Sequence, residues 1–560
     1  MTAAIRIATP TLRAQPRRVF AGILWLAVLA CASGAGAQSH KSSRASTRAA
    51  VKHRVPGAAR TAPAERDDVA RFRKRVETAL AAPGPDKGFW GLLVTDAATG
   101  EVVYARNADN YFSPASDAKL FTTALALASL GPDFRLRTVL GTTGSVSGAG
   151  PNQMLAGDLI LKGAGDANLS NRKFPYDKKV ERVGAPDKVL DEMADAVASS
   201  GIKTISGDVV VDDSLFARER FPSGWTTDDI LWSYGAAVSA IAINDNTFTL
   251  DVRPGDRDGA LAAYSVEPAT DFYTVENIAR TGVPGSAEKL SVSREPGSHA
   301  ILLGGTIPAR GPPRKLTIAV EEPAEYAAHL LVSLLEARGV HVNGTARAHH
   351  TFHANDWLIS SPHDDAPLTV LAEHLSPTLS DDVRLTNKMS ENLHAELLLL
   401  LSAHERAGIA TRDEAVKFAA NFFRTAGIAD GDVILHDGSG LSRGDLVTPR
   451  AVVQMLTYAT RQPWGEVYRS SLPVAGEDGT LSERMKHTAA EGRISAKTGT
   501  IDHVNSLSGY ATTARGAHLV FSILGDNNSL HAPAADAVLD SIAVAMVEEI
   551  GSAPAKKRKK

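Results

Sequence analysis

The 560-residue sequence predicts a mixed α/β protein with a strand-rich, domain-sized segment in its middle. Apolar helical runs lie at Leu120–Leu127 and Leu397–Leu401, and strand patterns lie at Arg493–Thr500 and Leu507–Thr513. Between these two halves, short strands alternate with turns. At 44% apolar residues, the chain is too long for one ordinary domain and has ample material for a core.

The chain contains a single Lys-Thr-Gly, at Lys497-Thr498-Gly499, followed by Thr500. It lies in the predicted strand Arg493–Thr500. An edge strand can hydrogen-bond a peptide laid antiparallel to it, and small Thr and Gly residues leave room for that peptide. Lys497 can neutralise a bound carboxylate and Thr498 can hydrogen-bond it. The backbone N–H of Thr500 can complete an oxyanion hole.

Ser-x-x-Lys occurs four times, and its context distinguishes one copy. Pro114-Ala115-Ser116-Asp117-Ala118-Lys119 runs directly into the apolar helical run. Ser116 is therefore expected on the first turn of a buried helix, where free N–H groups favour a developing anion. Lys119 follows at i+3 on the same face, and in a water-poor site its free amine can act as a base. Solvated loops are expected for the other three pairs, which are Ser170/Lys173, Ser200/Lys203 and Ser286/Lys289.

The only Ser-x-Asn is Ser390-Glu391-Asn392, just before the second apolar run. If the backbone turns there, a hydroxyl and an amide two residues apart can both point into a cleft. The alternative is a helix N-cap, for which Ser and Asn are ordinary choices. The other two motifs favour the site.

Ser-x-x-Lys, Ser-x-Asn and Lys-Thr-Gly, in that order, are the signatures of serine acyl-enzymes that act on D-alanyl peptides and β-lactams. The sequence resembles the class C low-molecular-mass penicillin-binding proteins, the D-alanyl-D-alanine carboxypeptidases and endopeptidases of peptidase family S13. Further matching stretches are Gly157–Leu159, Gly224-Trp225 with Asp228-Asp229, Ser376–Asp382, Asn387–Glu396, Asp437–Arg443, Leu472–Gly476 and Asp478–Leu481.

The resemblance implies a penicillin-binding/β-lactamase-like serine transpeptidase fold, a sheet sandwiched against helices and interrupted by two small β-rich domains. Ser116 and Ser390 are 274 residues apart, so the intervening segment is domain-sized. The expected organisation is a signal peptide at 1–37, a basic disordered linker with an N-terminal helix at 38–84, catalytic parts at 85–138 and 364–551, inserted domains at 139–363 and a basic tail at 552–560.

The resemblance also implies the chemistry, which is serine-type D-Ala-D-Ala carboxypeptidase and DD-endopeptidase activity on peptidoglycan stem peptides, with β-lactams as inhibitors. Ser116, Lys119, Ser390 and Asn392 would be catalytic, with Lys497, Thr498 and Thr500 binding substrate. Asp229 would meet the amine end of a peptide side chain, and Arg443 would take a carboxylate. For these last two, an ordinary surface or N-cap role is the alternative. The rival functions are a β-lactamase, an esterase with the same dyad, or a non-catalytic wall-binding protein.

The N-terminus reads as an export signal. Arg17-Arg18 precedes the apolar run Val19–Ala32, and Ala35-Gly36-Ala37 fits a signal-peptidase site. The expected location is the periplasm, by the Sec or the twin-arginine route. Cys31, the single cysteine, lies within the signal, so the mature chain is expected to have no disulfides; lipidation of Cys31 is the alternative.

Charge is unevenly spread along the chain. Residues 1–66 hold 11 Lys/Arg and one acid, and residues 556–560 are all basic. The rest has a net charge of −18. The basic ends favour weak attraction to an anionic membrane surface, with solvated tails as the alternative. The export signal argues against nucleic acid, and no phosphate-binding loop is present. The cluster His349, His350 and His353 lacks a carboxylate or cysteine ligand pattern, so neither a metal nor another cofactor is expected.

Overall fold

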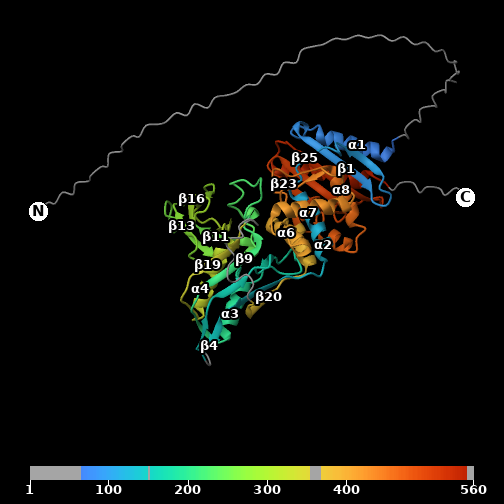
Figure 1. Cartoon of the computed structure of the whole chain (residues 1–560). Coiled ribbons are helices and arrows are strands. Elements are labelled where there is room, and N and C mark those ends of the chain that lie inside the picture. The colour runs from blue at the N-terminus through green and yellow to red at the C-terminus, as the bar shows by residue number, and fades with distance from the viewer. Residues whose placement is uncertain (1–64, 149–151, 353–366, 552–560) are drawn as a thin grey trace, which may run out of the picture. The chain divides into compact units, whose positions relative to one another are not determined.

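The structure, a computed structural model, describes residues 65–148, 152–352 and 367–551. A five-stranded antiparallel sheet joins the two ends of this region, in the order β2-β1-β25-β24-β23 (Figure 1). β1 pairs with β25 from Phe89↔Asp526 to Asp96↔Leu519. The strands are β1 (Phe89–Asp96), β2 (Val102–Arg106), β23 (Ile494–Ile501), β24 (Val504–Thr512) and β25 (His518–Asp526). The expected strand at Arg493–Thr500 is confirmed as β23.

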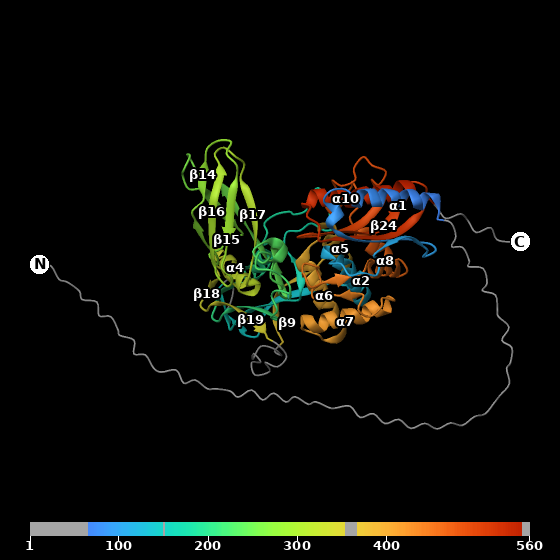
Figure 2. The same ribbon diagram turned by 90° about the horizontal axis from the view of Figure 1, so that it is seen from above.

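Helices cover both faces of this sheet, which explains why its central strands are apolar on both sides. On one face lie α1 (Asp67–Leu80) and α10 (Ala532–Glu549), as Figure 2 shows. There Trp90 and Phe521 share a buried cluster with Phe72 of α1 and Leu539 of α10. The other face packs against α8 (Pro449–Ala459).

A group of helices behind α8 surrounds α2 (Lys119–Leu130), whose run Leu120–Leu127 is completely buried. This is the helix expected after Ser116. Ser116 itself lies in a 3-10 turn, η2 (Ala115–Ala118), that leads into α2. The neighbouring helices are α5 (Leu379–Met389), α6 (Asn392–Ala407), α7 (Arg412–Thr425) and α9 (Gly465–Ser471). The short elements of the two terminal segments are η1 (Pro85–Lys87), β21 (Val433–Ile434), β22 (Leu446–Val447) and η5 (Gly479–Leu481).

Between α2 and α5 the chain builds further sheets around a separate apolar core. The largest has the order β19-β9-β6-β3-β20, and a second has the order β18-β8-β5-β4. Their strands are β3 (Arg137–Thr142), β4 (Ser145–Ser147), β5 (Gln153–Ala156), β6 (Leu159–Lys162), β8 (Ile202–Ile205), β9 (Val209–Ala217), β18 (His341–Val342), β19 (Ala346–Thr351) and β20 (Thr369–Leu375). Helices α3 (Lys188–Ser199) and α4 (Pro323–Ala337) contribute Val189, Leu190, Tyr326 and Leu330 to the same core.

The remaining strands of this region form three smaller sheets, with the orders β12-β11-β17, β13-β16-β14 (with β15 also on β16) and β10-β7. They are β7 (Asp166–Leu169), β10 (Ile241–Ile243), β11 (Thr247–Arg253), β12 (Ala263–Glu267), β13 (Thr274–Asn277), β14 (Arg280–Gly282), β15 (Lys289–Ser293), β16 (Ala300–Pro308) and β17 (Arg314–Ala319), with the short turns η3 (Ser233–Gly235) and η4 (Asn244–Asn246).

Strands β3 and β20, where the chain leaves and re-enters the helical part, pair with each other from Arg137↔Leu375 to Thr142↔Thr369. Both belong to the largest sheet of the middle region. We therefore propose that the inserted domains span residues 137–375, slightly more than the 139–363 expected from sequence. The expected signal peptide, Cys31, most of the linker and the basic tail lie outside the described residues. Within the described ranges, no helix is long and apolar enough to cross a membrane.

Candidate active site

Ser116 and Lys119 lie on one turn and contact each other. In a 3-10 turn the side chains at i and i+3 eclipse, and the Lys119 Nζ donates to the Ser116 Oγ over 2.9 Å. The same ammonium donates to Asn392 Oδ1 (2.6 Å) and to the Ser439 carbonyl (2.8 Å). All three of its N–H groups therefore have partners, and the Lys119 side chain is completely buried.

Burial lowers the pKa of Lys119 to about 8, even though the nearby carboxylates of Asp437 and Glu396 favour its charged form. A lysine with a pKa in this range has a useful fraction of free amine near neutral pH, which is what a general base requires.

Ser390 and Asn392 come from the break between two helices. α5 ends at Met389, and Ser390 has left-handed backbone angles (φ 64°, ψ 38°) that interrupt the helix before α6 begins at Asn392. The N-cap of α6 is Glu391, so neither Ser390 nor Asn392 fills the alternative capping role. Instead, Ser390 Oγ accepts from Lys497 Nζ (2.8 Å), and Asn392 Nδ2 donates to the Tyr234 carbonyl (2.7 Å).

Two glycines let other segments approach the nucleophile. A Cβ on Gly499 of β23 would lie 2.9 Å from the Ser116 nitrogen and 2.8 Å from the Pro114 oxygen. Gly440 has φ +81°, and a Cβ there would lie 1.8 Å from the Ala115 oxygen. The glycines of Lys-Thr-Gly and of the Asp437–Arg443 stretch thus have a steric reason to be glycine.

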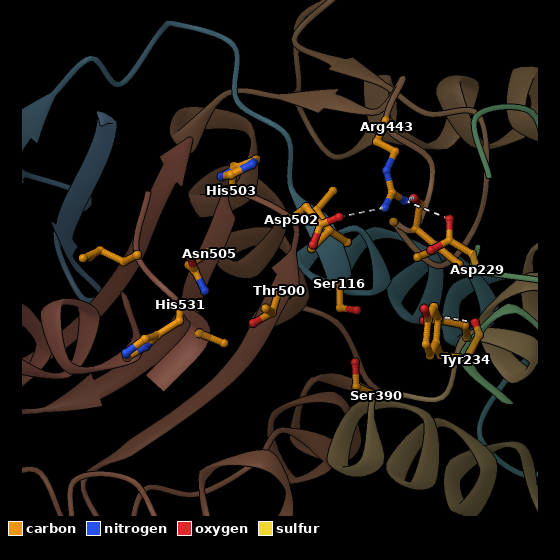
Figure 3. Close-up of a pocket in the computed structure, with 16 residues that line it drawn as sticks. Ser116, Asp229, Tyr234, Ser390, Arg443, Thr500, Asp502, His503, Asn505 and His531 are labelled. Atoms are coloured by element: carbon orange, nitrogen blue, oxygen red, sulfur yellow. Dashed lines mark hydrogen bonds and ion pairs between the residues drawn. The ribbon is translucent and has the colours of Figure 1, made fainter. Parts of the chain in front are cut away.

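These segments surround a cavity of about 520 Å³, a size typical of small-molecule sites (Figure 3). Six of the residues predicted from sequence line it: Ser116, Asp229, Ser390, Asn392, Arg443 and Thr500. Ser116, Ser390 and Thr500 lie near one another in the middle of the view, and Asp229 and Arg443 lie together to one side.

Lys497 and Thr498 do not line this cavity. Lys497 is completely buried and donates to Ser390 Oγ and to the Thr498 carbonyl (2.7 Å). Burial, together with the charge of Lys119, lowers the pKa of Lys497 well below its ordinary value. The Thr498 hydroxyl lies 2.8 Å from that of Thr480. Both residues lie behind the cavity surface, where Lys497 supports Ser390.

Asp229 and Arg443, predicted to bind two different substrate groups, contact each other. Arg443 Nη1 lies 3.1 Å from Asp229 Oδ2, and that carboxylate also accepts from the Thr226 backbone N–H (2.8 Å) and hydroxyl (2.7 Å). Asp229 is only 4% exposed. Each charge already has a partner, so a ligand that binds either group competes with this ion pair.

The cavity also contains residues that the sequence did not single out. They are Tyr234, Asp502, His503, Asn505 and His531 (Figure 3). Asp502, His503 and Asn505 closely follow the Lys-Thr-Gly-Thr stretch, so their nearness to that motif is a signal that could have identified them. Tyr234 and His531 have no motif around them, and local sequence gives no signal for either. The cluster His349, His350 and His353, at which no metal was expected, does not line this cavity. His350 Nδ1 lies 2.7 Å from Asp213 Oδ1, and His353 lies outside the described residues. Among the described residues, no three His, Cys, Asp or Glu side chains are placed to hold a metal ion.

The chain is similar to known proteins over most of its length. Residues 72–547 match the model of the D-Ala-D-Ala carboxypeptidase 3 (S13) family. The chain is 36% identical to a D-alanyl-D-alanine carboxypeptidase of Actinomadura sp. over 86% of this chain and 85% of the relative. It is 26% identical to the D-alanyl-D-alanine carboxypeptidase DacB of Haemophilus influenzae, over 78% of this chain and 85% of that protein.

The fold is also shared with a solved structure. Penicillin binding protein 4 of Haemophilus influenzae superposes with a TM-score of 0.70 at 24% identity, over 84% of this chain and 97% of that one. The predicted penicillin-binding fold and the predicted enzyme class, a D-Ala-D-Ala carboxypeptidase, are thereby confirmed. The chain belongs to the D-Ala-D-Ala carboxypeptidase 3 (S13) family of peptidases.

Proposed function

We propose that this carboxypeptidase works through an ester on Ser116. The free amine of Lys119 takes the Ser116 proton, and the Ser116 oxygen attacks the carbonyl of the penultimate D-Ala. The 2.9 Å contact between Lys119 Nζ and Ser116 Oγ supports this assignment more than any other observation.

The backbone N–H groups of Ser116 and Thr500 would stabilise the oxyanion that forms in this attack. The close approach of β23 to η2, which Gly499 permits, brings the two backbones together. Losing one such donor typically costs about 3 kcal/mol of transition-state stabilisation.

Ser390 would relay a proton to the leaving amine, and Asn392 would hold the substrate amide. The place of both side chains in the cavity beside Ser116 supports these roles, and each contacts a lysine of the site, Ser390 contacting Lys497 and Asn392 contacting Lys119. Lys497 and Thr498 would attract the terminal carboxylate of the peptide. Since Lys497 is buried, this attraction would act partly through Ser390 and partly through the field of the ammonium.

Hydrolysis of the ester by water would release the trimmed stem peptide. The same steps would cut a cross-link, giving DD-endopeptidase activity, when the leaving group is the side-chain amine of a neighbouring peptide. Arg443 and Asp229 would contact the far end of the acyl peptide by exchanging their mutual ion pair for substrate groups. β-Lactams would acylate Ser116 and inhibit the enzyme.

The substrate we propose is peptidoglycan, which the enzyme would reach in the periplasm after its export. The apolar N-terminal segment supports export, and the basic ends support a weak attraction to anionic membrane surfaces. The proposed chemistry uses the side chains of the chain itself, without a cofactor and without nucleic acid.

Incubation of the purified protein with wall muropeptides, read by mass, tests this proposal. We expect loss of one alanine from pentapeptides and conversion of cross-linked dimers to monomers. Products that retain both alanines and all cross-links would contradict the proposal. A stopped-flow measurement with penicillin separates it from a β-lactamase, since the proposal requires a long-lived penicilloyl-enzyme in place of rapid turnover.

A further inference from the structure

A buried turn of the inserted region has an unusual backbone. Asn244, Asp245 and Asn246 have φ angles of 50°, 57° and 52°, a left-handed run that non-glycine residues adopt rarely and that Asn and Asp tolerate best. Side-chain bonds hold the turn, since Asn246 Nδ2 donates to the Ala237 carbonyl and Asn244 Nδ2 to the Thr247 carbonyl, both over 2.9 Å. Such strain persists where the surroundings fix it, and it is concentrated at functional positions.

This turn carries the Asp245 carboxylate, which gathers three cationic side chains. Arg172 Nη2 lies 2.6 Å from Asp245 Oδ2, Arg182 contacts the same oxygen, and His394 Nε2 lies 3.2 Å from Oδ1. Burial alone would raise the pKa of Asp245, but Arg172, His394 and Arg182 hold it well below its usual range. The group is therefore a charged cluster in which Asp245 is the shared anion.

The cluster extends to the start of α6, where the Ser-x-Asn motif lies. Arg172 Nη2 also lies 2.5 Å from the carboxylate of Glu391, the middle residue of that motif. The Tyr234 carbonyl, again from the inserted region, accepts from Asn392. His394 is two residues further along. Three of the first four residues after Ser390 are thus held by groups from residues 137–375.

We propose that Arg172 and Asp245 of the inserted region are positioning residues for catalysis, acting through Glu391 and His394 on the loop that carries Ser390 and Asn392. The inference rests on the proposed function, because it assigns those two side chains to the reaction. Without the anchor, Asn392 Oδ1 would lose its fixed place 2.6 Å from Lys119 Nζ. A displacement of about 1 Å of a reacting group can cost on the order of 10²-fold in rate.

Glu391 and Glu181 provide a matched pair for testing this anchor. Both carboxylates lie 2.5 Å from the same arginine, and both are partly exposed, at 27% and 40% of their side chains. Only Glu391 lies on the catalytic loop. We expect Glu391→Ala to lower kcat on a D-Ala-D-Ala peptide by about 10-fold or more, with KM within about 2-fold. Glu181→Ala should leave both constants close to wild type.

A rescue variant separates positioning from a general loss of structure. Glu391→Gln keeps an oxygen that can accept from Arg172, so it should recover part of the lost kcat. Equal kcat for Glu391→Ala and Glu181→Ala, or a Glu391→Ala defect confined to KM, would overturn the inference. Failure of the proposed function would give a different result, because wild type would then cleave the D-Ala-D-Ala peptide no faster than Ser116→Ala does.

Discussion

The ammonium of Lys497 lies 2.8 Å from the hydroxyl of Ser390 and does not reach the surface of the cavity. The ammonium has three N–H groups, of which Ser390 and the Thr498 carbonyl take two. Lys497 therefore has two possible functions, to orient Ser390 and to supply positive charge behind the place of a substrate carboxylate.

Lys497→Ala separates these two functions. On a D-Ala-D-Ala peptide we expect kcat/KM to fall by about 10²-fold or more, because a hydrogen bond to a charged group is worth about 1.5–3 kcal/mol and Ser390 also loses its support. On a small thioester without a carboxylate, the loss should be clearly smaller. Steady-state kinetics on both substrates check this. Equal losses would mean that Lys497 serves only the general electrostatics of the site.

Ser116→Ala should abolish covalent labelling by fluorescent penicillin and leave the fold intact. The reason is that only Ser116, among the four Ser-x-x-Lys serines, contacts its lysine within the cavity. Gel fluorescence reports the labelling, and circular dichroism reports the fold. Ser200→Ala, in another copy of the motif, is the control and should label normally, because Ser200 is exposed and its hydroxyl bonds to the nearby Val197 carbonyl. Labelling that survives in Ser116→Ala would show that another serine is the nucleophile.

The acylation rate should rise with pH and level off above about pH 8, because the free amine of Lys119 is the proposed base and burial lowers its pKa to about 8. Lys119→Arg keeps the charge but supplies a group that does not deprotonate in this range. We expect the acylation rate of Lys119→Arg to be at least about 10²-fold lower than that of wild type and to show no rise with pH. Stopped-flow acylation between pH 6 and 10 measures both effects. A variant with near-normal rates would move the base function to another group.

Local patterns predicted those parts of the site that lie on one turn or one strand. Ser116 and Lys119 are three residues apart, so a helical turn alone places them together. Local sequence patterns also predicted the strand β23 and the backbone turn at Ser390. No local rule gives the distance between Asn392 and the Tyr234 carbonyl, which are 158 residues apart, or the burial of Lys497.

The pairing of Asp229 with Arg443 shows the same limit. The sequence predicts a separate substrate group for each residue, yet the two side chains lie 3.1 Å apart although 214 residues separate them in sequence. A single sequence carries no signal for such a contact, because ion pairing depends only on where the fold places the two side chains.

The sequence Gly-Asp stands directly before two strands of the inserted region. Gly157-Asp158 precedes β6, and Gly207-Asp208 precedes β9; these two strands are parallel neighbours, with Leu159 opposite Val209. Strand pairs β5/β6, β8/β9 and β18/β19 each place one strand in each of two sheets. The turn between β18 and β19 has Asn343-Gly344 in place of Gly-Asp, so the sequence alone does not identify this third strand pair.

His394 is completely buried between the carboxylates of Asp382 and Asp245. Burial alone would lower the pKa of His394, but these two carboxylates raise it to about 10. A raised pKa in the folded state stabilises the fold fully below the unfolded value of about 6.5, and this stabilisation is lost as pH rises through about 10. His394→Gln removes one partner of a buried ionic cluster, so we expect it to reduce the free energy of unfolding by roughly 3–5 kcal/mol near neutral pH.

The difference between wild type and His394→Gln should then shrink steadily from pH 6.5 to pH 10. Over this range the imidazole of wild type is neutral in the unfolded state but still protonated in the folded state, so rising pH favours unfolding of wild type alone. Urea denaturation at several pH values measures that difference directly. Other groups that titrate in the same window, Lys119 among them, are present in both proteins and cancel in the comparison. A difference that stays constant with pH would show that His394 is already neutral in the folded protein.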